Sequence, residues 1–252
     1  MIRVKNLLRD FSDPVSDARS RLASLIGVRQ IKSSHRAIQG VSFDLPVGSV
    51  LGIVGRNGAG KSTMLKILGG LITPTAGEVH VPQKTQSLLN LSLGLHHELT
   101  GNENLLFQAV LLGMSRSDAK DLLPKMQQIS GLEEADLIRP LKHYSDGMRL
   151  RVAFASSIIQ KADLWLVDEV LGVGDASFFQ FSLNCLLDKV RQGMTLITAS
   201  HDLSLLSRVC THILWLERGE QVAYGDCTVQ ILEQYANFVR SELDIKFETL
   251  LS

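Results

Sequence analysis

The feature that most constrains the fold is a glycine-rich loop that directly follows a short apolar run. The apolar run is Val50–Val54, and the loop covers residues 55–63 with the sequence GRNGAGKST. A continuous apolar run predicts a strand buried on both faces, and glycines permit the tight turn by which such a strand leads into a helix. The sequence therefore predicts a strand, a loop and a helix in direct succession.

The loop also predicts a phosphate site. It matches Gly-x-x-x-x-Gly-Lys-Ser, in which backbone N–H groups approach phosphate oxygens that side chains at Gly58 and Gly60 would obstruct. Lys61 is expected to reach the β- and γ-phosphates, and the Ser62 hydroxyl is expected to bind Mg²⁺. We therefore expect a nucleoside triphosphate to bind here with Mg²⁺. The predicted binding residues are Gly55, Arg56, Asn57, Gly58, Ala59, Gly60, Lys61, Ser62 and Thr63.

Composition narrows the class of protein. The 252 residues carry no formal net charge and are 45% hydrophobic, which excludes a largely disordered chain and any global field that would attract nucleic acid. Cys185, Cys210 and Cys227 show no metal-ligand spacing and are typical of thiols in a reducing compartment. No apolar stretch reaches the ~18 residues that span a bilayer. Work at a membrane is therefore expected to need another chain.

Further apolar runs predict the rest of the sheet. Leu164–Val167, Thr195–Ala199 and Ile213–Leu216 are continuous, which favours a largely parallel sheet with helices on both faces. Residues 41–48 alternate instead and are expected to form an edge strand of an antiparallel layer. Residues from about 98 to 160 give little strand signal and are expected to form a helical subdomain. The predicted fold class is α/β, with a parallel sheet of the P-loop NTPase (RecA-like) type, an antiparallel β layer and a helical subdomain.

Local signals place several helices. Thr100 and Ser115 each begin a capping-box sequence within the helical subdomain. Residues 12–36 form an amphipathic, arginine-containing insertion whose ordinary role is to cover a core, although its arginines also suit an anionic surface. Residues 228–243 have apolar side chains at helical spacing and are expected to pack as a C-terminal helix. We expect a single nucleotide-binding domain over residues 1–252.

Two adjacent acids follow one of the predicted buried strands. Asp168 and Glu169 come directly after Leu164–Val167. Asp168 is expected to hold Mg²⁺ beside the phosphate loop, and Glu169 is expected to accept a proton from the attacking water. An ordinary strand end, where charges reach solvent, is the alternative for an isolated Asp-Glu pair. The phosphate loop about a hundred residues upstream favours hydrolysis.

A second phosphate-type site is predicted at the start of another helix. Ser145 and Gly147 lie in the sequence YSDGMR, just before the helical run 152–160, and free N–H groups at a helix N-terminus attract anions. A simple serine N-cap is the alternative. Because residues 55–63 already hold the phosphates of one nucleotide, this site needs a second nucleotide or a second chain.

A histidine completes the set of candidate catalytic residues. His201 follows the predicted strand Thr195–Ala199. At the carboxyl end of a strand in an α/β sheet, its side chain is expected to hydrogen-bond the γ-phosphate and the attacking water. An isolated histidine at such a position is more often structural. The phosphate loop, the Asp-Glu pair and the Ser145 site elsewhere in the sequence favour a role in hydrolysis. The predicted catalytic residues are Lys61, Glu169 and His201, and the predicted metal ligands are Ser62 and Asp168.

These four elements, in this order, resemble the nucleotide-binding subunit of ABC transporters over residues 1 to about 225. The resemblance implies a homodimer that holds two ATP molecules, each between the phosphate loop of one subunit and the Ser145/Gly147 signature of the other. It assigns Asp175 to communication across the dimer. It also implies an integral-membrane transport subunit as partner and a location on the cytoplasmic face of the cell membrane.

Departures from the common family pattern narrow the resemblance to one branch of the family. The signature has Tyr, Asp and Met where most members have Leu, Gly and Gln, and the segment around Asp175 reads VLGVGDASF. Both variants are similar to the ATPase subunits of bacterial polysaccharide exporters, which move lipid-linked O-antigen, capsule or teichoic acid chains. A lipid-linked glycan is therefore the expected cargo. The alternatives are a lipid or drug cargo, a soluble ABC protein that acts on nucleic acid or ribosomes, and a small-molecule phosphotransferase.

Two ordinary features of the family have no clear match. The position of the usual Q-loop glutamine falls near residues 90–92, where the sequence has no glutamine. For the aromatic residue that stacks on adenine, His35 occupies the approximate place and Phe11 is a more remote candidate. The membrane subunit is expected to contact the region from Ser92 to Asn104.

Overall fold

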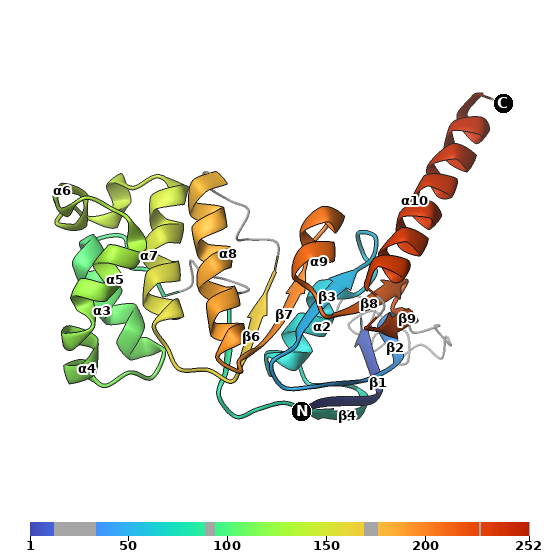
Figure 1. Cartoon of the computed structure of the whole chain (residues 1–252), viewed down its shortest axis with the longest axis horizontal. Helices are drawn as coiled ribbons and strands as arrows, with labels where there is room; N and C mark the ends of the chain where they lie inside the picture. The colour runs from blue at the N-terminus through green and yellow to red at the C-terminus, as the bar shows by residue number, and fades with distance from the viewer. Residues whose placement is uncertain (13–33, 89–93, 169–175, 227, 252) are drawn as a thin grey trace, which may run out of the picture. The chain divides into compact units, whose positions relative to one another are not determined.

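The computed structural model describes residues 1–12, 34–88, 94–168, 176–226 and 228–251, with the backbone alone for residues 243–251. The chain divides into two compact units (Figure 1). The first unit comprises Met1–Val81 and Ala199–Ser252, and the second comprises Pro82–Thr198. The predicted Glu169, Asp175 and Q-loop positions, and most of the 12–36 insertion, lie outside the described residues.

The first unit is built on a mixed sheet. Its strands follow one another in the order β4-β1-β2-β9-β8-β3, with β3 parallel to β8 and with β1 antiparallel to both β2 and β4. Among the described residues of this unit, the helices are α2, α9 and α10. The elements are β1 (Ile2–Ser12), β2 (Ser34–Leu45), β3 (Val50–Val54), β4 (Ala76–His80), β8 (His212–Glu217), β9 (Glu220–Gly225), α2 (Lys61–Leu68), α9 (Leu203–Val209) and α10 (Thr228–Leu251).

The strands of this unit confirm some sequence predictions and correct one. The apolar run Val50–Val54 is β3, and all five of its residues are buried. Residues 41–45 belong to β2, but β2 lies between β1 and β9 and is therefore not an edge strand. The prediction of an edge strand at 41–48 was wrong, because alternating polarity reports which faces are buried and not which strand lies alongside. In this unit β4 lies at the edge.

The second unit combines a short parallel sheet with a group of helices. Strand β6 pairs in parallel with β5 on one side and with β7 on the other. The helices from α3 to α7 pack together, and α8 packs against α7 (Figure 1). The elements are β5 (Thr85–Ser87), α3 (Gly101–Leu111), α4 (Arg116–Asp121), α5 (Leu123–Ser130), α6 (Glu134–Leu137), a 3-10 turn (Leu141–His143), α7 (Asp146–Ile158), β6 (Leu164–Val167), α8 (Ala176–Arg191) and β7 (Thr195–Ala199).

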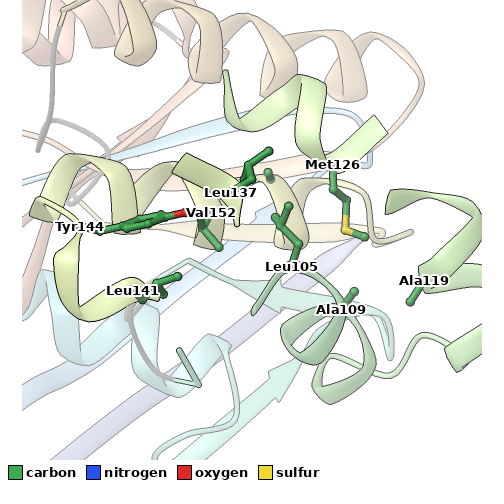
Figure 2. Packing of buried hydrophobic residues seen from close by; sticks show 9 residues of the cluster. Leu105, Ala109, Ala119, Met126, Leu137, Leu141, Tyr144 and Val152 are labelled. Carbon is green, nitrogen blue, oxygen red and sulfur yellow. The ribbon is translucent and has the colours of Figure 1, made fainter. Parts of the chain in front are cut away.

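The helices of the second unit have their own hydrophobic core. Leu105 and Ala109 from α3, Met126 from α5 and Val152 from α7 are all fully buried in it (Figure 2). The predicted capping box at the start of α3 is complete, since the Thr100 hydroxyl accepts from Glu103 N–H and the Glu103 carboxylate accepts from Thr100 N–H. At α4 the structure shows the Ser115 side chain accepting from Asp118 N–H.

Parallel and antiparallel strands with covering helices confirm the predicted α/β fold class with its antiparallel layer and helical subdomain. Among the described residues, no helix is both long enough and apolar enough to cross a bilayer.

Candidate nucleotide-binding site

The phosphate loop connects β3 to α2 and is held by the strands around it. The Ala59 carbonyl accepts from Gly219 N–H at 3.0 Å, and Gly219 C=O in turn accepts from Gln39 N–H on β2 at 2.8 Å. Inside the loop, Ala59 N–H donates to the Arg56 carbonyl at 3.0 Å. The loop backbone is therefore hydrogen-bonded to the β8–β9 turn, which is itself bonded to β2.

The three glycines of the loop are needed for different reasons. Gly55 has φ +153°, and a Cβ there would lie 2.2 Å from the Leu216 carbonyl oxygen. Gly60 combines a φ of +105° with a Cβ position only 2.6 Å from the Ala37 carbonyl oxygen. At Gly58 a Cβ would meet no protein atom within 4 Å, so the requirement is its φ of +81°. Protein packing thus explains Gly55 and Gly60, and backbone conformation explains Gly58.

Helix α2 begins without a side-chain cap. Its N-cap is Gly60, which has no side-chain acceptor, and no acidic residue lies in the first turn. The N–H groups at a helix N-terminus carry partial positive charge and favour an anion. Lys61 adds a full positive charge at this end of the helix. Its Nζ donates to the carbonyl oxygens of Gly55 at 2.6 Å and Arg56 at 3.2 Å, so the ammonium lies over the loop.

The backbone and the side chain of Arg56 have different environments. The backbone is part of the loop, whereas the guanidinium forms ion pairs with Glu217 of β8 and Glu242 of α10. The hydrogen bond from Arg56 to Glu217 is the main cause of a raised pKa of Arg56. Sequence reasoning treated Arg56 only as a loop position, since nothing local indicates partners so far along the chain.

The candidate metal ligands differ in their settings. Ser62 is exposed in the first turn of α2, and the half-buried Asp168 follows the fully buried strand β6. No group of three His, Cys, Asp or Glu that could hold a metal was found among the residues that the structure describes. A hydroxyl and one carboxylate suit Mg²⁺, which retains water and phosphate oxygens and needs few protein ligands. The donor types present therefore fit Mg²⁺ better than a metal that needs an all-protein cage.

His201 follows β7 and directly precedes the N-cap of α9. His201 is exposed, and Asp202 is the N-cap of α9, where its Oδ1 accepts from Leu205 N–H at 2.9 Å. The sequence analysis did not single out this cap, although Asp before a helix is an ordinary N-cap signal. Asp202 begins the helix directly after His201 and so limits the backbone positions that His201 can take.

The predicted signature forms the start of α7. Ser145 is the N-cap, with its Oγ accepting from Met148 N–H at 3.3 Å, and Gly147 lies in the first turn. Asp146 would repel a phosphate, but its Oδ1 pairs with Arg149 Nη1 at 2.8 Å. Since this partner offsets the carboxylate charge, the unusual Asp in the signature remains compatible with an anion at α7.

The unusual tyrosine of the signature belongs to the core of the helical subdomain. Tyr144 is 4% exposed, its hydroxyl is directed toward Leu137 (Figure 2), and it donates to the Asp136 carbonyl at 2.6 Å. A Cβ at Gly101 would lie only 2.3 Å from Tyr144 Oη. Gly101 therefore leaves space that the Tyr144 hydroxyl occupies, so the unusual tyrosine of the signature depends on a glycine in α3.

The segment before α3 is bonded to the segment before the signature. Leu141 N–H donates to the Leu99 carbonyl at 3.0 Å, and Lys142 N–H donates to the His97 carbonyl at 2.9 Å. Asn104 is fully buried and bonds back to this segment, with Oδ1 accepting from His96 N–H at 2.7 Å. The sequence placed Asn104 only at the end of the predicted contact region, because no local pattern reveals that a helical asparagine bonds back to the preceding loop.

The two candidates for adenine stacking are neighbours. Phe11 on β1 and His35 on β2 are directly opposite in the antiparallel register. The Arg9 guanidinium lies over the Phe11 ring, 4.5 Å from its centroid. The structure thus brings both candidates to one place on the β1–β2 pair and offers Phe11 as an aromatic surface there.

Comparison with protein families gives one match over more than half of the chain. A family model described as ABC transporter matches residues 38–172. The O-antigen export system ATP-binding protein RfbB of Myxococcus xanthus is 36% identical over 197 residues, covering 77% of this chain and 45% of the relative. The teichoic acids export ATP-binding protein TagH of Listeria innocua is 35% identical over 212 residues, covering 84% of this chain and 62% of the relative. The chain spans about half the length of the curated relatives it matches.

Solved structures show the same fold. A dimeric, post-hydrolysis structure of the ATP-binding cassette MJ0796 with ADP and Pi has a TM-score of 0.71 and 21% identity, covering 90% of this chain and 98% of that one. The structure of an ATP binding subunit of an ABC transporter has a TM-score of 0.72 and 22% identity, covering 94% and 93% of the two chains. At this level of identity the likeness concerns the fold.

Proposed function

Because the chain belongs to the ABC transporter family, we propose that it is an ATP-hydrolysing subunit of an exporter whose membrane part is a separate subunit. The observation that carries the proposal is the phosphate loop. Gly60 begins α2 without a side-chain acceptor, and the Lys61 ammonium lies over the Gly55 and Arg56 carbonyls. Backbone donors and one lysine at a helix N-terminus suit a triphosphate.

We assign the hydrolytic roles as follows. Lys61 contacts the β- and γ-phosphates and stabilises their charge, and Phe11 or His35 meets the adenine ring. Ser62 and Asp168 hold Mg²⁺, which when bound neutralises phosphate charge and orients the triphosphate. Glu169 accepts the proton of the attacking water, and His201 donates a hydrogen bond to the γ-phosphate. Glu169 lies outside the described residues, so its role rests on its place directly after Asp168.

We propose that two copies of the chain form the active unit. Ser145 and Gly147 at the start of α7 suit an anion, and the loop of residues 55–63 already accounts for the phosphates of one nucleotide. In a head-to-tail homodimer, each α7 N-terminus meets the nucleotide on the other subunit, and Asp175 lies at the contact between the two copies. The similar cassette MJ0796 has been solved as a dimer.

A surface of α3 and α4 is our candidate for contact with the membrane subunit. A cavity of about 290 Å³ opens there, and its lining is largely apolar. Phe107 is 46% exposed and Leu111 is 61% exposed. Clustered apolar side chains on a surface are typical of protein contacts. The cavity is lined by Glu103, Leu106, Phe107, Val110, Arg116, Ala119 and Lys120.

This surface adjoins the region that we predicted for the contact. Glu103 lines the cavity and also completes the cap of α3, while the buried Asn104 bonds the preceding loop. Because that loop is hydrogen-bonded to the segment before Ser145, a partner on α3 is positioned to sense movement of the signature. We place the protein on the cytoplasmic face of the cell membrane through this partner.

We propose a lipid-linked glycan as the cargo. The relatives from Myxococcus xanthus and Listeria innocua are named for export of O-antigen and teichoic acids. Tyr144 belongs to the signature, one of the two sequence variants that carry the resemblance to this branch. A lipid or drug cargo is the alternative within transporters.

The proposal is tested with purified protein and with cells that lack the chain. Lys61→Ala should abolish ATP binding and turnover, while Lys66→Ala, which removes an exposed lysine of the same helix, should leave both intact. Cells without the chain should lose surface glycan, and the wild type should restore it. Normal turnover by Lys61→Ala would contradict the ATPase assignment. Full surface glycan together with loss of another cargo would contradict the glycan assignment alone.

A further inference from the structure

Helix α10 packs on the strand that runs beside the phosphate-loop strand. It contacts β8, β9 and α9, and β8 is the parallel neighbour of β3. From α10, Ile231, Leu232 and Tyr235 are buried, with exposures of 5% to 7%. The first half of the helix is therefore anchored in the same unit as the loop.

One loop side chain is held by this helix. The Arg56 guanidinium pairs with Glu242 of α10 and with Glu217 of β8, where its Nε lies 2.9 Å from Glu217 Oε1. It also lies over the Phe238 ring of α10, 5.3 Å from the centroid. The three charged side chains are between 15% and 34% exposed, so water screens the ion pairs only in part. We call Arg56, Glu217, Phe238 and Glu242 the Arg56 clasp.

Aromatic contacts connect the clasp to β8 through Phe238. Trp215 of β8 packs against Tyr235 and Phe238, with ring centroids 5.6 Å and 5.3 Å apart. Burial raises the pKa of Tyr235 and the charge of Glu217 adds to the increase, while Arg56 and the Gly55 backbone N–H oppose it. Residues of α10 therefore contact the loop at the Arg56 side chain.

We propose that α10 positions the phosphate loop through the Arg56 clasp, so that docking of α10 and binding of ATP favour each other. This proposal rests on the proposed function of the loop as the ATP site. The clasp fixes the residue whose carbonyl contacts both Ala59 N–H and Lys61 Nζ. A loop already held in one conformation loses less entropy when it binds phosphate, which strengthens binding. Because linkage is reciprocal, bound ATP must favour the docked helix by the same factor.

The direction in which the Kd for ATP changes when the Glu242 charge is removed distinguishes this proposal from a simple charge effect. Glu242 places a negative charge near a site for a polyanion, so its removal should strengthen ATP binding if charge at a distance were the only influence. If the clasp positions the loop, the same removal weakens binding. Glu242→Gln retains the size of the side chain while removing its charge, so the two explanations predict opposite shifts in Kd.

The first experiment measures Kd, KM and kcat for Mg-ATP in the full chain. Glu242→Gln should raise Kd and KM roughly two- to fivefold, and Phe238→Leu, which retains an apolar side chain, should raise them less. Glu233→Gln removes a charge from an exposed position of the same helix and should change neither. Because the clasp does not touch the reacting atoms, kcat at saturating ATP should change less than about twofold. In an Arg56→Gln background, Glu242→Gln should add no further increase.

A second experiment measures the docking of α10 itself by amide hydrogen exchange. Because its main comparison uses the wild type, it remains informative if a variant is less stable. In the wild type, Mg-ATP should slow amide hydrogen exchange in α10, and this slowing should disappear in Arg56→Gln at saturating ATP. The proposal would be overturned if Glu242→Gln left the Kd for Mg-ATP unchanged or lowered it. It would also be overturned if Mg-ATP did not change the rate of amide hydrogen exchange in α10 of the wild type. If the wild type itself bound no ATP, the proposed function and the clasp would both fail. If Lys61→Ala lost binding while Glu242→Gln left Kd unchanged, the clasp alone would fail.

Discussion

Two helices of this protein begin with residues suited to phosphate, but they are built in different ways. Helix α2 starts at Gly60, with φ 105° and no side-chain cap, whereas α7 starts at Ser145 in extended conformation with its Oγ accepting from Met148 N–H. A hydroxyl that accepts one hydrogen bond can still donate its own proton to a phosphate. In our proposal the α2 site therefore uses backbone N–H groups and Lys61, whereas the α7 site uses a serine side chain that also caps the helix.

The surroundings of the two helix starts differ as well. No acidic residue lies in the first turn of α2, while α7 has Asp146 there, paired with Arg149. The loop before α2 is fixed by neighbouring strands, and the segment before α7 is fixed by Tyr144 in a helical core. This difference fits our proposal that α2 supplies the primary phosphate site and that α7 meets the nucleotide of the other subunit.

The largest expected effect comes from a substitution that should stop hydrolysis while leaving nucleotide binding at both helix starts intact. Glu169→Gln removes proton acceptance and should lower ATP turnover about 10² to 10⁴-fold, because general-base catalysis contributes this much. Binding at α2 and α7 should persist, so ATP-bound dimers should accumulate in size-exclusion chromatography with Mg-ATP. Turnover near the wild-type rate would remove Glu169 from this role.

A mixed dimer tests whether the two helix starts act together from different subunits. Gly147→Glu adds volume and negative charge at α7 and should block closure on a phosphate, whereas Gln128→Glu adds the same charge at an exposed site of α5 and should not. Pairing a Gly147→Glu subunit with a Lys61→Ala subunit leaves one composite site intact. Nucleotide photocrosslinking should then join the two subunits at that site. Crosslinks confined to one subunit would contradict the shared site.

Packing behind α7 should have a smaller effect that can be measured as stability. Gly101→Ala places a Cβ 2.3 Å from Tyr144 Oη, and the resulting strain should cost about 1–3 kcal/mol in the free energy of unfolding. Tyr144→Phe removes that oxygen, so the double variant should be more stable than the sum of the single effects predicts. Urea unfolding of the four proteins measures the coupling. Strict additivity would show that the two residues do not constrain each other.

The smallest expected effect distinguishes a helix N-cap that also binds phosphate from one that only stabilises its helix. Ser145→Ala and Thr100→Ala each remove a helix N-cap and should each cost roughly 1 kcal/mol of stability. Both losses are followed by thermal unfolding. Only Ser145→Ala should also raise KM for ATP, because only Ser145 is assigned to a phosphate. Equal kinetic effects of the two variants would make Ser145 a structural cap.

Short-range patterns were reliable guides to local structure. The apolar run Val50–Val54 is a buried strand, and the Thr100 sequence forms a complete capping box. These features depend on neighbouring residues, so no knowledge of the fold is needed to predict them. The edge position assigned to residues 41–48 was wrong, because β9, which lies beside β2, comes from a distant part of the chain.

For the candidate site, the sequence by itself determined the phosphate loop, the helix start at Ser145 and the chemical types of the proposed catalytic groups. Only the tertiary structure decided that Arg56 pairs with Glu217 and Glu242, which lie 161 and 186 residues away. It likewise decided that Gly101 makes room for Tyr144. A loop conformation and a helix cap are properties of adjacent backbone atoms, whereas ion pairs and close packing depend on which distant segments the sheet and the helical core bring together.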